Sequence, residues 1–156
     1  MKFVSESIIE NVMNQASDDV EAHIAQLRES QPILLSYLVS EQFELLTTEE
    51  KTYFIYLAWV LHEATQQVQP RDTLIEEEEI GQAEEKNWTQ IEAGNKKDFR
   101  VILDPFFETT DQEDLLAFIE DALTEEEEEG VLTTAGRELM FVGLKTSLDV
   151  LIGHES

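Results

Sequence analysis

The sequence contains no cysteine, which excludes a disulfide framework, a thiolate metal site and a cysteine nucleophile. Proline and glycine are scarce, at 3 and 6 residues of 156, and no alternation of apolar and polar residues typical of strands persists. The longest apolar run, YFIYLAWVL at 53–61, is about half as long as a membrane-spanning helix needs. The first residues lack the continuous apolar block of a secretion signal. We therefore expect an all-α cytoplasmic protein that does not enter membranes.

Positive charge is also scarce. The chain has 10 lysines and arginines against 35 aspartates and glutamates, which gives a formal net charge of -25. Such a surface repels phosphate backbones and anionic lipids, so nucleic acid and membranes are not expected partners. The partners that it attracts are cations, either metal ions or a basic protein surface.

Helical periodicity extends over nearly the whole chain and predicts a single domain, 1–156, that is a bundle of six to eight helices. Segment 48–68 is apolar on every side and follows a Thr47-x-x-Glu50 capping box, so we expect it to be the central helix. Segment 98–108 is either a short strand or, as Pro105 favours, a short helix or turn. The other expected helices are 2–14, 18–29, 32–45, 73–92, 111–123 and 134–152.

Two stretches of the chain resemble each other. Residues 34–57 and 115–144 both contain an amphipathic segment, the letters LTT and a bulky second segment. Two interpretations remain open: a duplicated helical hairpin with an insertion at 125–129, or the chance similarity of amphipathic helices.

The two glutamate runs are predicted to differ in their position on helices. Glu76 to Glu79 fall in a first helical turn, where the helix dipole stabilises carboxylates by a few tenths of a kcal/mol each. Glu125 to Glu129 would crowd the opposite, negative end of a helix that begins near 111. We therefore predict that this helix ends near Leu123 and that an acidic loop or break covers about 124–131.

Motifs for catalysis and for metal binding are missing from the sequence. There is no Glu-x-x-His pair for a di-iron bundle, and HEATQ at 62–66 lacks the second histidine of a zinc protease motif. Phosphate-binding glycine loops and nucleophile elbows are also missing. We expect no catalytic residues, no metal site and no cofactor.

The function predicted from composition is a non-catalytic interaction module that binds a basic protein, either as an inhibitor or immunity-type protein or as an adaptor. The alternative is a small-molecule binder or enzyme with a pocket in the bundle core near Tyr56, Trp59 and His62. A third interpretation is that the charge serves solubility alone. No sequence feature specifies an oligomeric state. The acidic residues predicted to contact a basic partner are Glu76, Glu78, Glu79, Glu85, Glu125, Glu126, Glu127, Glu128 and Glu129.

Overall fold

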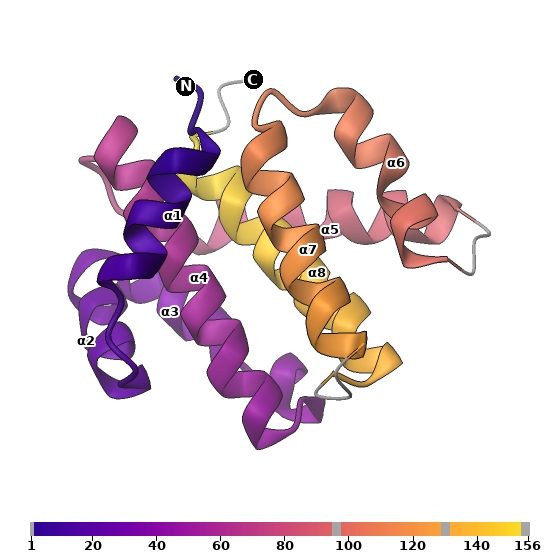
Figure 1. The fold of residues 1–156 in the computed structure, drawn as a ribbon, viewed down its shortest axis with the longest axis horizontal. Coiled ribbons are helices and arrows are strands. Elements are labelled where there is room, and N and C mark those ends of the chain that lie inside the picture. The colour runs from indigo at the N-terminus through magenta and orange to yellow at the C-terminus, as the bar shows by residue number, and fades with distance from the viewer. Residues whose placement is uncertain (1, 95–97, 129–131, 154–156) are drawn as a thin grey trace.

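The computed structural model describes residues 2–94, 98–128 and 132–153, and the chain is helical over most of them (Figure 1). The predicted all-α bundle of six to eight helices is confirmed, with eight α-helices and one 3-10 helix in this part of the chain. The elements are α1 (Glu6–Gln15), α2 (Val20–Ser30), α3 (Pro32–Leu38), η1 (Glu41–Leu45), α4 (Thr48–Val68), α5 (Glu77–Ala93), α6 (Phe99–Thr109), α7 (Glu113–Glu128) and α8 (Thr134–Leu151).

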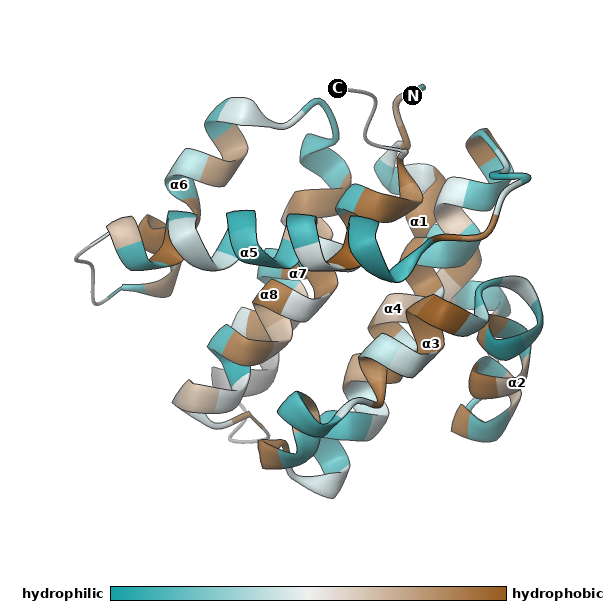
Figure 2. Cartoon of the chain, turned by 180° about the vertical axis from the view of Figure 1, so that it is seen from behind, coloured by the Kyte–Doolittle hydropathy of each residue, from teal (hydrophilic) through white to brown (hydrophobic). Residues whose placement is uncertain are grey.

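Two helices, α4 and α8, form the centre of the bundle. The prediction for 48–68 is confirmed, and α4 packs against α1, α2 and α8. Helix α8 has an equal share of the centre, because it packs against α4, α5 and α7. Figure 1 shows α1 and α7 on the near side of this pair, and Figure 2 shows α5 running across α8 on the opposite side. The molecule therefore has two distinct faces, one formed by α1, α4 and α7 and the other by α5.

The start of α4 is fixed by the predicted capping box. The Thr47 hydroxyl accepts a hydrogen bond from the Glu50 amide at 3.1 Å, and the Glu50 carboxylate accepts one from the Thr47 amide at 2.9 Å. The cap satisfies two amide groups that the first helical turn would otherwise leave unpaired. This local signal explains why the predicted and observed starts of α4 agree.

Other predicted helix ends were wrong by a few residues. Helix α5 begins at Glu77 rather than near 73, and α7 begins at Glu113 rather than at 111. The segment predicted as one helix over 32–45 is divided, because α3 ends at Leu38 and a 3-10 helix follows. Segment 98–108 is a helix, α6, and not a strand. Pro105 lies inside α6, whose buried face is made by Phe99, Leu103 and Phe106.

The predicted break after Leu123 was also wrong where the structure describes it, because α7 continues to Glu128. Glutamate has a good intrinsic helix propensity, and each residue that continues the helix gains a backbone hydrogen bond. The unfavourable dipole effect amounts to only a few tenths of a kcal/mol per residue, so it does not end the helix. The remainder of the predicted break, 129–131, lies outside the described residues.

The two similar stretches are not placed equivalently in the fold. Helix α7 packs along α8, whereas α3 packs chiefly against α2 and α5. What the stretches share is a threonine N-cap, Thr47 for α4 and Thr133 for α8. The duplication remains a hypothesis that rests on this local likeness.

Candidate functional site

Two clefts lie beside α1, and we call them together the tyrosine groove. One cleft, of about 540 Å³, is bounded by the end of α1, the start of α2 and the first turns of α4. The other, of about 330 Å³, lies between α1, α4 and α7. Both are lined by Met13, Tyr53 and Tyr56, so the two clefts adjoin along these three side chains.

The tyrosines face the groove because they are three residues apart on α4, which places them on one side of the helix. Their rings stack with centroids 6.3 Å apart, and the Tyr53 hydroxyl donates a hydrogen bond to the Ala122 carbonyl at 3.2 Å. The Tyr56 hydroxyl donates to no acceptor among the described residues, and burial raises the pKa of this phenol. Tyr56 is therefore a neutral donor available to a bound partner.

Met13 is the third side chain that both clefts share, and it belongs to the floor of the groove. It belongs to α1 and is 39% exposed, although it is a large apolar side chain. Methionine is flexible and polarisable, which suits it to contact surfaces that must adapt to a partner. The floor of the groove is thus apolar and partly accessible.

Carboxylates surround this floor. No lysine or arginine is among the described residues that line the two clefts. Asp114 accepts a hydrogen bond from the Glu6 amide at 3.0 Å, and Asp121 lies 3.9 Å from a guanidinium nitrogen of Arg100. The other rim acids make no ion pair with any described residue, so the groove combines an apolar floor with uncompensated negative charge. The acids that line the groove are Glu6, Glu10, Asp18, Glu49, Asp114 and Asp121.

His23 of α2 also lines the larger cleft, and the sequence prediction missed it. Its ring is only 3% exposed and stacks on Trp59 with centroids 4.5 Å apart. Neither ring nitrogen makes a well-formed hydrogen bond with a described residue. Burial lowers the pKa of His23 most strongly, while the Asp19 charge and the Ser17 carbonyl act in the opposite direction. A neutral imidazole therefore completes the aromatic wall.

The predicted core pocket near Tyr56, Trp59 and His62 is divided in the structure. Tyr56 lines both clefts, and Trp59 is buried, with its indole donating to Gln26 at 2.6 Å. His62 is 2% exposed, lies 2.9 Å from a Glu63 carboxylate oxygen and lines neither cleft. Of these three side chains, only Tyr56 lines the two clefts. The position of His23 on the buried side of α2, four residues before Leu27, was the signal that could have identified it.

The acids predicted as contacts fall into three groups. Glu76, the N-cap of α5, and Glu78 and Glu85 within α5 are exposed, and this helix lies on the side of the molecule opposite the groove (Figure 2). Glu79, also expected to be exposed, is only partly exposed and forms an ion pair with Arg71 at 2.9 Å. Residues 125–128 belong to α7, but their side chains, like the whole of Glu129, lie outside the described part of the chain.

The contacts of Glu79 show that it stabilises the fold. Burial is the largest effect and raises its pKa, but the bonds from Arg71 and from the Glu76 amide together lower the pKa below its usual value. Arg71 also donates to the Val150 carbonyl at 2.7 Å. Glu79 therefore helps to fix the start of α5 against the end of α8.

Fold and site together define an all-α, acidic helical bundle with an apolar groove rimmed by carboxylates. No protein-family model, curated protein or solved structure matches the chain. Within the described ranges, no group of three or more histidines, aspartates and glutamates is arranged to hold a metal ion. The described helices also include none with the length and apolarity needed to cross a membrane.

Proposed function

We propose that the protein is a non-catalytic interaction module that binds a basic, amphipathic segment of another protein in the tyrosine groove. The observation that carries this proposal is the apolar floor of Met13, Tyr53 and Tyr56 inside a rim of acids with no lining cation. Apolar side chains of the partner enter the two clefts, and its lysines or arginines lie over the rim. An inhibitor and an adaptor would both use this arrangement.

The floor and the rim of the groove contribute differently to binding: the floor mainly to the affinity, and the rim mainly to the association rate. Each partner side chain of leucine or phenylalanine size that is fully buried contributes about 1.5–3 kcal/mol. Exposed rim charges contribute less to affinity, but they steer a basic partner and raise the association rate. Net charge of -25 strengthens this steering and disfavours nucleic acid as the partner.

The alternative function, an enzyme or small-molecule binder with a pocket at His62, receives no support from the geometry. His62 contacts Glu63, and the clefts near Tyr56 do not include it. Met13, which lines both clefts, is 39% exposed, so a segment of another protein can reach the groove from solvent.

The test uses a synthetic helical peptide with leucines on one face and lysines on the other. A scrambled peptide of identical composition serves as the control for charge alone. We expect titration of isotope-labelled protein to shift the backbone amide signals of α1 and of the first half of α4, and the scrambled peptide to bind at least about tenfold more weakly. Equal affinity for both peptides would show that binding reports only the net charge and would overturn the proposal.

Two sets of substitutions with the same change in charge locate the surface. Neutralisation of the rim by Glu10→Gln, Asp18→Asn and Glu49→Gln together is expected to weaken peptide binding several-fold. The matched set on the opposite face is expected to change the affinity less than about twofold, because exposed charges beyond a Debye length are screened. Equal effects of the two sets would contradict binding in the groove. The matched set is Glu76→Gln, Glu78→Gln and Glu85→Gln.

A further inference from the structure

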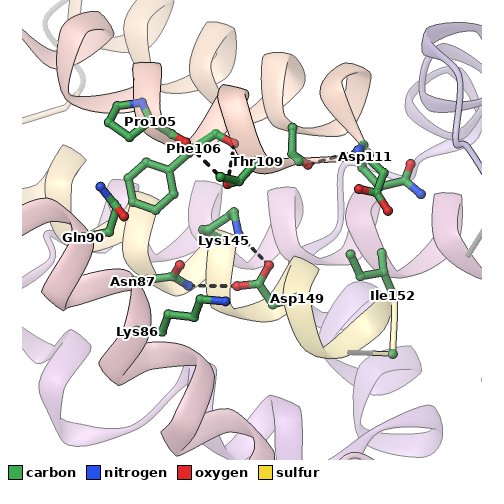
Figure 3. Close-up of a pocket in the computed structure, with 13 residues that line it drawn as sticks. Lys86, Asn87, Gln90, Pro105, Phe106, Thr109, Asp111, Lys145, Asp149 and Ile152 are labelled. Atoms are coloured by element: carbon green, nitrogen blue, oxygen red, sulfur yellow. Dashed lines mark hydrogen bonds and ion pairs between the residues drawn. The ribbon is translucent and has the colours of Figure 1, made fainter. Parts of the chain in front are cut away.

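A second, polar cavity lies away from the tyrosine groove, where α5, α6 and α8 meet (Figure 3). Its volume is about 270 Å³, which is just under the usual size of small-molecule sites, so it admits one small molecule and no peptide segment. Polar side chains of two facing helices line part of it and determine which ligand it fits. They are Lys86 and Asn87 of α5 and Lys145 and Asp149 of α8.

A buried carboxylate holds Lys145 and Asn87 next to each other. The Lys145 ammonium lies 2.5 Å from one oxygen of Asp149, and the other oxygen accepts a hydrogen bond from the Asn87 amide at 3.1 Å. Asn87 is 2% exposed, and the side chains of Lys145 and Asp149 are 13% and 9% exposed. Because both groups contact the same carboxylate, the ammonium and the Asn87 amide are adjacent and are positioned before a ligand arrives.

This network leaves hydrogen-bond donors and an acceptor unused at the cavity. An ammonium has three protons, and among the described residues only Asp149 accepts one from Lys145. The Asn87 amide nitrogen donates to Thr146 at 3.1 Å as well as to Asp149, so both of its protons are used. Its carbonyl oxygen accepts no hydrogen bond from a described residue, and Figure 3 shows it directed away from Asp149. The cavity therefore offers N–H donors beside a carbonyl acceptor.

The charges around these groups favour a ligand without charge. An anion bound to Lys145 would lie close to the Asp149 carboxylate, and the net charge of -25 would also repel it. A cation bound to the Asn87 oxygen would lie close to the Lys145 ammonium, which repels it. A neutral molecule avoids both repulsions.

Hydroxyl groups complement such a pair of sites, because a hydroxyl both donates and accepts hydrogen bonds. Two hydroxyls on adjacent carbon atoms can accept a proton from Lys145 with one oxygen and donate a proton to Asn87 with the other. Figure 3 shows Lys86 beside Asn87, so a third hydroxyl can accept from Lys86. Pro105 and Ile152 also line the cavity and provide apolar surface for the C–H groups of a ring.

We propose that this cavity binds a neutral ring polyol, such as a monosaccharide, through two adjacent hydroxyl groups that bridge Lys145 and Asn87. The ring lies between α5 and α8 on one side and α6 on the other. This binding does not depend on the tyrosine groove, whose clefts share no lining residue with the cavity.

Amide-shift mapping with glucose, galactose, mannose and myo-inositol tests the proposal. The comparison ligand is cyclohexanol, which has a six-membered ring but a single hydroxyl. We expect at least one polyol to shift the amide signals of Asn87 and Lys145, and cyclohexanol to bind at least about tenfold more weakly, because it leaves a donor or an acceptor unpaired. If cyclohexanol binds as tightly, the cavity does not recognise a hydroxyl pair. If none of the polyols shifts these signals, or if only Tyr53 and Tyr56 respond, the proposal is overturned.

Substitutions of two glutamines on α5 separate binding from folding. Gln90 is exposed and lines the cavity, so Gln90→Trp is expected to obstruct it and to lower the affinity for the polyol at least about tenfold. Gln82 is the matched control, because it is exposed on the same helix and does not line the cavity. Gln82→Trp should leave the affinity unchanged, and the two variants should have similar melting temperatures. Equal affinities of the two variants would contradict binding in the cavity.

A lysine substitution tests the third hydrogen bond. Lys86 is exposed and has no ion-pair partner in the described part of the chain, so Lys86→Met is expected to weaken polyol binding several-fold without changing the melting temperature. Lys51→Met is the control, because Lys51 is a partly exposed lysine that pairs with Glu44 at 3.1 Å and does not line the cavity. Equal affinities of these two variants would show that the polyol does not reach Lys86 and would contradict the proposed orientation.

Discussion

Glu50 accepts two hydrogen bonds from Thr133, which is 83 residues further along the chain. One carboxylate oxygen lies 3.0 Å from the Thr133 amide and 3.1 Å from its hydroxyl, and the other closes the capping box with Thr47. Glu50 is 0% exposed. Gly136 makes room for it, because a side chain there would collide with the carboxylate. A single glutamate thus joins the N-termini of the two central helices.

The first prediction concerns removal of this carboxylate. Glu50→Ala leaves the Thr47 amide, the Thr133 amide and the Thr133 hydroxyl without their buried acceptor, and each lost partner costs about 1 kcal/mol or more. We expect the free energy of unfolding in urea to fall by about 3 kcal/mol. The exposed neighbour Glu49 is the control, and Glu49→Ala should change the free energy of unfolding by less than about 0.5 kcal/mol. Similar small losses in both variants would show that the contact with Thr133 does not stabilise the fold.

The second prediction is a pH dependence carried by the same group. Burial has the largest single effect on Glu50 and raises its pKa, but the hydrogen bonds from Thr47 and Thr133 together lower the pKa of the folded protein below the ordinary value of 4.5. The unfolded chain therefore binds the proton more readily. The stabilisation is fully present above the ordinary pKa and is lost as the pH falls through the folded value.

The measurement is a difference between two proteins, because many other carboxylates also titrate. The free energy of unfolding of the wild type minus that of Glu50→Gln should be constant near neutral pH and should shrink below about pH 4.5, where the unfolded wild-type chain takes up a proton at Glu50 before the folded protein does. A difference that stays constant down to acid unfolding would mean that the folded protein does not hold Glu50 in its charged form preferentially.

The third prediction concerns the close approach of α4 and α8. A methyl group at Gly143 would come within 2.5 Å of the Phe54 ring, which is 1% exposed. We expect Gly143→Ala to destabilise the protein by about 1–3 kcal/mol through overpacking. Gly81 is the matched helical control, because a methyl group there meets nothing within 4 Å. Gly81→Ala should stabilise the protein by about 0.5–1 kcal/mol.

The combination of Gly143→Ala with Phe54→Leu completes this test, because the smaller side chain frees the space that the methyl group needs. We expect this double variant to lose less stability than the sum of the two single losses. If Gly143→Ala were as stable as Gly81→Ala, the helices would be free to separate at no cost, and Gly143 would not set their distance.

Helix ends could be predicted where one local signal decides them. Thr47 and Glu50 satisfy each other's amide groups, so the start of α4 follows from four consecutive residues. The same motif failed at Thr73, whose carbonyl accepts hydrogen bonds from Gln31 and Arg71 and keeps the residue in the loop before α5. Gln31 lies 42 residues earlier in the chain than Thr73. A sequence motif reflects only neighbouring residues, whereas a tertiary contact helps to keep Thr73 out of α5.

The candidate site could be predicted only in part for a similar reason. Tyr56 was identified because it belongs to an evidently central helix. Met13 and His23 come from separate helices, and periodicity shows which face of each helix is buried without showing which helices meet. The rim acids were not predicted because they come from separate segments of the chain, which only the packing of the helices brings together. Composition indicated the sign of the surface charge, but packing decided where that charge surrounds an apolar floor.

The last prediction follows from the net charge of -25 itself. Self-repulsion destabilises the compact state, and salt relieves it as the Debye length falls from about 30 Å at 0.01 M to about 8 Å at 0.15 M. We expect the melting temperature to rise by several degrees over this range, since about 1 kcal/mol corresponds to 2–4 °C for a chain of this size. Neutralisation of Glu76, Glu78 and Glu85 removes three negative charges from α5 and its N-cap and should make the rise smaller. A melting temperature that does not respond to sodium chloride would show that the acids are already neutralised in the folded protein. A comparison of sodium and magnesium salts at equal ionic strength would then distinguish bound cations from screening.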